Sequence, residues 1–273
     1  MSLTSETRVP LSGGAFPEAV EVVLLAGGTF DDLPEGEDPR GKGLVMLAGV
    51  PMAARTLRAL AGSPAVSRII LVSPVPSSEL TDPCWEAVDV VVPAGERLID
   101  SFRAGMDAVS DQDQPAMVVA GDLPLLTSEA VTDFVERCRS RQDVEIWYSC
   151  LRRTNSEAAF PGVRHTYARL AEGVFCGAGM FLSRPNSLQP LYQAMTSLTY
   201  ARKAPWKLIK LLGAELILTY IFGRVTIPQA ERGMSRLLGG TVCAGIETPY
   251  PESAFNVDDL ETLQEARRYF ESV

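Results

Sequence analysis

The fold is decided by the stretch Val118–Leu126, which reads Val-Val-Ala-Gly-Asp-Leu-Pro-Leu-Leu. Its start, together with Met117, is a short apolar run that predicts a strand buried on both faces. The strand must end near Pro124, because proline cannot donate a hydrogen bond to a continuing ladder. Asp122 therefore falls at the carboxyl end of the strand, and ligands of open α/β sheets bind at that edge. The alternative left open is that Asp122 only caps a helix that begins near Thr127.

Strands and helices alternate on both sides of this stretch. The apolar patterns predict strands at 20–25, 66–72 and 87–92, and helices at 52–60, 99–109 and 128–139. A β-α-β-α order of this kind is typical of a parallel sheet with crossover helices. The sequence therefore predicts an α/β fold of three layers, α/β/α, with a mostly parallel sheet.

The second half of the chain is less regular. It predicts strands at 144–151, 173–182 and 241–246, and helices at 190–198, 206–222, 227–238 and 260–270. We expect residues 18–273 to form a single domain with a helical elaboration at about 186–240. The polar, Gly- and Pro-rich residues 1–17 are expected to form a flexible N-terminus without the features of a signal peptide.

The composition favours a cytoplasmic protein that binds small molecules. A formal net charge of -9 argues against nucleic acid or an anionic membrane as the main partner. The five cysteines form no Cys-x-x-Cys pair and there is one histidine, so reduced thiols are expected and a structural zinc site is not. The apolar stretch Leu208–Phe222 is too short to span a bilayer and contains Lys210 and Glu215. We expect it inside the protein or at the interface of a homo-oligomer.

A second feature follows the first predicted strand, where Leu25 and Ala26 lead directly into Gly27 and Gly28. Glycines placed directly after a strand let backbone amides approach a phosphate closely. The pattern matches neither Gly-x-Gly-x-x-Gly nor the Walker motif, so it is weak alone. Lys42 follows after an acidic loop, and a surface lysine without a ligand is the alternative there.

Three pieces of sequence now stand in a definite order: Leu25-Ala26-Gly27-Gly28 with Lys42 and Gly49-Val50-Pro51-Met52; Gly121-Asp122-Leu123-Pro124-Leu125; and Asn256-Val257-Asp258. Together they resemble the MobA-like nucleotidyltransferases of the nucleotide-diphospho-sugar transferase superfamily. The resemblance extends over about Val20 to Phe270 and is looser between residues 152 and 240. It implies a Rossmann-like fold of the glycosyltransferase-A type.

The resemblance also implies an activity, since members of the family move a nucleoside monophosphate from a nucleoside triphosphate to a phosphorylated sugar or cofactor. It places the nucleotide against a set of six residues: Leu25, Ala26, Gly27, Gly28, Ser101 and Gly121. It implies that Lys42 and Asp122 are catalytic and that Asp122 and Asp258 hold Mg²⁺. From the residues alone, Asp258 could instead only cap the last helix.

Two other functions remain open at this stage. A glycosyltransferase of the same fold would consume a nucleotide sugar, but such enzymes place Asp-x-Asp at the strand end, where this chain has the single Asp122. A non-catalytic nucleotide-binding regulatory protein is the third reading. One departure from the family favours this non-catalytic reading. The family places an arginine after the glycines, and this chain has Thr29-Phe30-Asp31-Asp32 there; Arg40, farther along the chain, is the candidate substitute.

Overall fold

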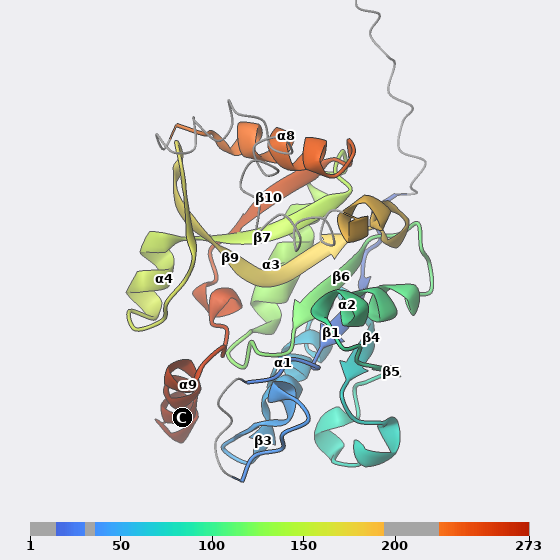
Figure 1. Cartoon of the computed structure of the whole chain (residues 1–273), viewed down its shortest axis with the longest axis vertical. Coiled ribbons are helices and arrows are strands. Elements are labelled where there is room, and N and C mark those ends of the chain that lie inside the picture. The colour runs from blue at the N-terminus through green and yellow to red at the C-terminus, as the bar shows by residue number, and fades with distance from the viewer. Residues whose placement is uncertain (1–14, 31–35, 194–223, 273) are drawn as a thin grey trace, which may run out of the picture.

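The computed structural model describes residues 15–30, 36–193 and 224–272, in which one central sheet carries helices on both faces (Figure 1). Eight strands of the described chain form this sheet, in the order β10-β7-β9-β6-β1-β4-β5, with β8 paired to β9. The strands are β1 Val20–Leu25, β4 Val66–Ser73, β5 Val90–Pro93, β6 Ala116–Ala120, β7 Ile146–Arg152, β8 Tyr167–Leu170, β9 Gly173–Ser183 and β10 Cys243–Thr248. A separate two-stranded hairpin joins β2 Met46–Leu47 to β3 Val50–Pro51.

The sheet is parallel except around β9. Strand β1 runs parallel to β4 and β6, β5 runs parallel to β4, and β10 runs parallel to β7. Strand β9 runs antiparallel to its neighbours β6, β7 and β8. The predicted α/β fold with a mostly parallel sheet is therefore confirmed.

The helices divide between the two faces of the sheet. They are α1 Met52–Ala61, α2 Leu98–Asp107, α3 Ser128–Arg139, α4 Arg153–Ala159, α8 Ile227–Leu237 and α9 Leu260–Ser272. Apolar residues of α1 and α3 pack on one face, and those of α2 and the end of α8 pack on the other. In the part of the chain that the structure describes, no helix is long and apolar enough to cross a membrane.

Some predicted elements need correction. A 3-10 turn at Lys42–Leu44, for which no element was predicted, precedes the short strand β2. The strand expected from Ala87 begins only at Val90. Of the helix expected at 190–198, the described part is helical from Gln189 to Gln193, and the helix expected at 206–222 lies wholly outside the described residues.

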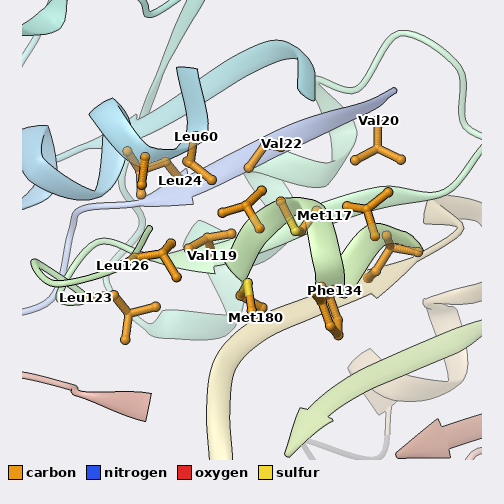
Figure 2. Packing of buried hydrophobic residues seen from close by; sticks show 14 of the residues in the cluster. Val20, Val22, Leu24, Leu60, Met117, Val119, Leu123, Leu126, Phe134 and Met180 are labelled. Atoms are coloured by element: carbon orange, nitrogen blue, oxygen red, sulfur yellow. The ribbon is translucent and has the colours of Figure 1, made fainter. Parts of the chain in front are cut away.

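The core on the α1/α3 face is built by alternate residues of the strands (Figure 2). Val22 and Leu24 of β1 point to this face with Val119 of β6, and each is fully buried. Phe134 of α3 and Leu60 of α1 close the layer, also without exposed surface. Full burial of such a side chain stabilises the fold by about 1.5–3 kcal/mol, so this layer fixes the register of β1 beside β6.

A smaller apolar cluster joins the end of the chain to its beginning. Leu263 of α9 and Val257, which precedes it, are buried with Leu47 of β2 and Met52 of α1. The backbone amide of Val257 also donates to the carbonyl of Asp122, at 3.0 Å. The loop before α9 is therefore held against the carboxyl end of β6.

Candidate active site

Asp122 lies two residues after the end of β6 and is only 7% exposed. Its Oδ2 is ion-paired with Lys42, and its Oδ1 accepts a hydrogen bond from Asn256 Nδ2 at 3.2 Å. The cap of α3 is Thr127, whose Oγ1 accepts from the backbone amide of Ala130 at 3.2 Å. Asp122 is therefore not a helix cap, and its buried charge is compensated by a cation and an amide donor.

Asp258 reaches the same place from the other end of the chain. Its Oδ1 lies 2.8 Å from Lys42 Nζ, and its side chain is 70% exposed. The cap at the start of α9 is the next residue, Asp259, whose Oδ1 accepts from the backbone amide of Thr262 at 2.8 Å. The reading of Asp258 as a helix cap is therefore wrong, and its carboxylate remains available to the site.

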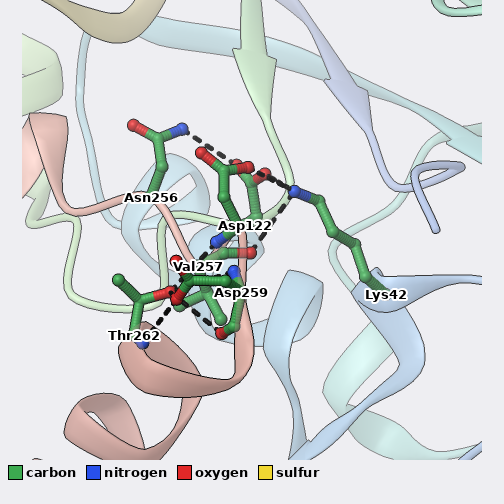
Figure 3. Close-up of polar contacts among 7 residues, drawn as sticks. Lys42, Asp122, Asn256, Val257, Asp259 and Thr262 are labelled. Carbon is green, nitrogen blue, oxygen red and sulfur yellow. Dashed lines mark hydrogen bonds and ion pairs between the residues drawn. The ribbon is translucent and has the colours of Figure 1, made fainter. Parts of the chain in front are cut away.

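Lys42 is ion-paired with both carboxylates, and Figure 3 shows its side chain extending toward Asp122. Its Nζ contacts Asp122 and Asp258 and donates to the carbonyl of Val257 at 3.3 Å. Burial opposes the charged ammonium, but the two carboxylates outweigh it, so the pKa of Lys42 is raised above its ordinary value. Lys42 is therefore a partly buried cation in an ion-pair cluster, in contrast to a free surface lysine.

The glycine loop after β1 packs tightly against its surroundings. A Cβ added at Gly27 would lie 2.6 Å from the Cβ of Ala94, and one at Gly28 would lie 3.1 Å from Cε of Lys42. The backbone amide of Lys42 donates to the carbonyl of Gly28 at 2.6 Å. Close approach of the backbone to Ala94 and Lys42 is therefore the local reason for the two glycines.

Ser101 and Gly121 complete the walls of this loop. Ser101, on α2, is 5% exposed, and its Oγ accepts from the amide of Gly95 at 2.9 Å, which fixes the turn beside Gly27. A Cβ at Gly121 would lie 2.7 Å from the carbonyl of Leu25, and the Gly121 amide donates to the same carbonyl at 2.8 Å. Ser101 thus has a structural role in the turn, and its contact with the nucleotide stays a prediction.

The predicted site residues are therefore brought together at the carboxyl ends of β1 and β6. The set is Leu25, Ala26, Gly27, Gly28, Lys42, Ser101, Gly121, Asp122 and Asp258. Sequence reasoning missed Asn256, whose amide orients Asp122, although Asn256 belongs to the motif that contains Asp258. Arg40 is paired with Asp38 and Glu79 in this structure, so its guanidinium has other partners than the residues around Lys42.

The oxygen atoms around Lys42 suit a magnesium ion. Asp122 Oδ2, Asp258 Oδ1 and the Val257 carbonyl converge on one point, which the Lys42 ammonium occupies here. Mg²⁺ prefers oxygen ligands and commonly takes one or two carboxylates together with substrate phosphate and water. No group of three or more His, Cys, Asp or Glu side chains gathers within the described residues. A site of two carboxylates therefore fits an ion that shares its ligands with a substrate.

The fold and this site define a nucleotidyltransferase. Solved structures with the same fold include a hypothetical transferase from Thermus thermophilus, at a TM-score of 0.75 and 28% identity, covering 90% of this chain and 99% of that one. The CMP:2-keto-3-deoxy-manno-octonic acid synthetase in complex with CTP is similar at a TM-score of 0.59 and 15% identity, covering 94% and 99%. The 2-C-methyl-D-erythritol 4-phosphate cytidylyltransferase of Francisella tularensis is similar at a TM-score of 0.56 and 14% identity, covering 92% and 100%.

The family follows from the sequence itself. The MobA-like NTP transferase domain matches residues 22–197, which is more than half of the chain. The chain belongs to the MobA-like NTP transferase family. A comparison with curated proteins gave no match. The family match ends before Asp258, so that residue is joined to the site by the structure and by the sequence motif.

Proposed function

We propose that the protein is a magnesium-dependent nucleotidyltransferase that moves a nucleoside monophosphate from a nucleoside triphosphate to a small phosphorylated sugar or cofactor. The observation that carries this proposal is the pair of carboxylates, Asp122 and Asp258, on one ammonium. Each carboxylate has a neighbour, Thr127 or Asp259, that caps the adjacent helix in its place. Two carboxylates that are held close together and cap no helix are suited to a cation and a substrate phosphate.

The reaction joins two phosphates and releases a third group. An oxygen of the acceptor phosphate attacks the α-phosphorus, and the bond from that phosphorus to the bridging oxygen of the β-phosphate breaks. Pyrophosphate leaves with the electron pair of the broken bond. Positioning and charge neutralisation dominate in such transfers, because the protein forms no covalent bond of its own.

The residues of the chain have separate parts in this reaction. The glycine backbone at Gly27 and Gly28 accommodates the triphosphate closely, and Lys42 neutralises phosphate charge as a compact ammonium. Asp122 and Asp258 hold Mg²⁺, and Asn256 keeps Asp122 in its orientation. When bound, Mg²⁺ supplies positive charge beside the phosphates.

The similar structures support this choice of substrates. One is named a synthetase in complex with CTP, and another is named a cytidylyltransferase of a sugar-alcohol phosphate. A nucleoside triphosphate and a phosphorylated acceptor are therefore the substrates we expect here. The cytoplasm is the compartment that the reduced cysteines and these soluble metabolites favour.

A double-mutant cycle tests the metal site. Asp122→Asn and Asp258→Asn keep shape and remove charge, so each should weaken Mg²⁺-dependent nucleotide binding by about tenfold or more. Because both would bind one ion, the double change should cost much less than the sum of the single changes. The measurement is nucleotide affinity against Mg²⁺ concentration, after the four ribonucleoside triphosphates are compared by thermal shift.

The control is Asp259→Asn, which removes the same charge one residue away. Asparagine caps a helix about as well as aspartate, so the control should keep the cap of α9 and leave the Mg²⁺ dependence unchanged. Additive effects of the two site changes would overturn the shared metal site. Pyrophosphate release distinguishes the nucleotidyltransferase from the two other candidate functions. A regulatory protein would bind the nucleotide without releasing pyrophosphate, and a glycosyltransferase would consume a nucleotide sugar.

A further inference from the structure

A cavity of about 620 Å³ opens from the active site onto the face of the sheet that carries α2 and α8. Two of its lining residues, Asn256 and Asp258, belong to the carboxylate cluster, and Leu25 and Ala120 end the strands that precede the site. Its far end reaches Met234 on α8. In Figure 1, strands β9, β7 and β10 lie between the labels of α2 and α8. The cavity therefore begins where phosphate chemistry would occur and runs across the sheet.

A second cavity of about 290 Å³ continues in the same direction. Both cavities are lined by Tyr148, Gly177, Met234 and Cys243. We call the two cavities together the apolar trough. The larger cavity lies in the range of sites that enclose a small organic molecule, about 300–1,000 Å³, and the smaller one extends it.

The hollow depends on small residues of β9. A Cβ added at Gly177 would lie 2.0 Å from the hydroxyl oxygen of Tyr148, so only glycine lets the ring lie across the strand. A Cβ at Gly179 would lie 2.5 Å from Cδ1 of Leu123. Gly177 and Gly179 both line the larger cavity without a side chain, so the sheet surface stays low along β9.

The trough also gathers exposed apolar surface. Among the described residues, six large apolar side chains are exposed, and three of them line the trough: Leu98, Tyr148 at 49% exposed and Met234 at 44% exposed. Soluble proteins rarely expose such side chains in one hollow unless a ligand or partner covers them. Continuity with the active site favours a substrate as that ligand.

The charge of the lining restricts the substrate further. The described residues that line the trough include no Lys, Arg or His, and the charged ones are Asp258, Glu231 and Glu247. Burial raises the pKa of Cys150 to about 11 and that of Cys243 to about 12, so both are neutral thiols at pH 7. A ligand rich in hydroxyls or phosphates would be left with unpaired polar groups on such a surface.

We propose that the apolar trough receives the body of the acceptor, and that this acceptor is the monophosphate of an aromatic or alicyclic molecule with few hydroxyl groups. The inference rests on the proposed nucleotidyl transfer, because the single phosphate of the acceptor would lie at the Asp258 end. The rest of the molecule would lie between β9 and α8, against Tyr148 and Met234. This choice favours a cofactor-like acceptor over a sugar phosphate.

The first arm of the test measures the trough without any reaction. The probe is N-phenylnaphthylamine, an uncharged dye whose fluorescence rises in apolar surroundings. Met234→Asp places a charge in the trough and should weaken dye binding by about tenfold or more, since the bound dye would remove water from the carboxylate. The matched control is Ser235→Asp, which adds the same charge to α8 at a residue that does not line the trough. Dye affinity should be the same in the control and in the unchanged protein.

The second arm identifies the class of occupant by displacement of the dye. Naphthyl phosphate should displace it, and glycerol phosphate, which has the same phosphate on a polar body, should not. Mg²⁺ should strengthen displacement by naphthyl phosphate in the unchanged protein and not in Asp258→Asn, because the phosphate end would lie at the metal site. Nucleoside triphosphates with Mg²⁺ should leave the dye in place.

Each other outcome overturns the proposal in a recognisable way. Absence of dye binding would mean that the trough is closed to ligands, and displacement by triphosphates would mean that it receives the base. Displacement by glycerol phosphate as strong as by naphthyl phosphate would remove the apolar preference. Failure of nucleotidyl transfer itself would show separately, as absence of pyrophosphate release and of Mg²⁺-dependent nucleotide binding, with the dye results unchanged.

Discussion

Lys42 gives the site a cation of its own. Its ammonium lies where the oxygens of Asp122 and Asp258 meet, so a metal ion can share both carboxylates only if Lys42 moves toward a phosphate. The same three residues would then hold either an internal ion pair or a metal with a triphosphate. In the absence of a ligand, the ammonium between the two carboxylates offsets their mutual repulsion.

Replacing Lys42 should separate its competition with Mg²⁺ from its neutralisation of phosphate charge. Lys42→Met removes the competing ammonium, so Mg²⁺ alone should bind about tenfold more tightly, since a unit charge 4 Å away contributes several kcal/mol at an effective dielectric constant near 20. Nucleotidyl transfer should nevertheless fall by about a hundredfold or more, because phosphate charge is no longer neutralised. Calorimetric titration with Mg²⁺ and pyrophosphate release measure the two effects. The control is Arg40→Met on the same loop, whose cation pairs with Asp38 and Glu79. Weaker Mg²⁺ binding in Lys42→Met would show that Lys42 does not compete for the carboxylates.

The single histidine offers a direct probe of Asp258. Burial lowers the pKa of His165 below its ordinary 6.5, and the Asp258 carboxylate opposes this shift. Asp258→Asn should therefore lower the pKa of His165 further, and Mg²⁺ bound to Asp258 should do the same. Proton NMR gives one imidazole titration, because the chain has one histidine. Asp107→Asn, an exposed change on α2, should leave the curve in place. An unchanged curve in Asp258→Asn would contradict the electrostatic contact.

At the scale of elements, the apolar pattern predicted the buried strands, because burial requires apolar side chains. Runs such as Val20–Leu25 and Val66–Ser73 are buried on both faces of a sheet, so their existence and approximate ends were predictable. The antiparallel direction of β9 was not predictable, because an apolar strand has the same pattern in either direction. Helix α4 was missed because it buries only Ser156 and is supported by the exposed pair Arg153–Glu157, which leaves no apolar stripe to detect.

Helix α2 depends on one glycine for its position on the sheet. A Cβ at Gly105 would lie 2.2 Å from Cγ1 of Val23 and 2.9 Å from Cγ2 of Val72, both fully buried. Gly105→Ala should therefore lower the free energy of unfolding by about 1–3 kcal/mol through overpacking, against a helix propensity gain of about 1 kcal/mol. Urea denaturation measures the change.

A second change tests the cause of that loss. Val23→Ala removes the methyl groups that would meet the new Cβ, so the double variant Gly105→Ala with Val23→Ala should be more stable than the sum of the single losses predicts. Additivity would mean that the cost of alanine arises elsewhere than at β1. Because α2 also carries Ser101, any shift of the helix would extend to the turn at Gly95.

At the scale of the whole molecule, the site is assembled from both ends of the described chain. Lys42 comes from the first quarter, Asp122 from the middle, and Asp258 from the C-terminal part. Sequence reasoning could group them because three motifs stood in a known order, yet it could not show the hydrogen bond from Asn256 to Asp122 or choose between capping and ligand roles. That hydrogen bond and the pairing of Asp258 with Lys42 join residues more than 100 positions apart, which no local pattern encodes.

Completion of the site should therefore depend on the packing of α9. Leu263 is 1% exposed in the apolar cluster that holds Val257, and Leu60 is equally buried in the separate cluster between α1 and the sheet. Leu263→Ala and Leu60→Ala should each lower the free energy of unfolding by about 2–5 kcal/mol, as buried Leu-to-Ala changes do.

Only one of these two changes should lower the affinity for the nucleotide. Leu263→Ala loosens the loop that carries Asn256 and Asp258, so Mg²⁺-nucleotide affinity should fall several-fold, because binding must first order that loop. Leu60→Ala creates a similar cavity away from the loop and should leave the affinity unchanged. Both affinities are measured at a temperature where denaturation curves show each variant folded. Equal losses would mean that nucleotide binding follows global stability, and no loss in Leu263→Ala would mean that the loop holds its position without α9.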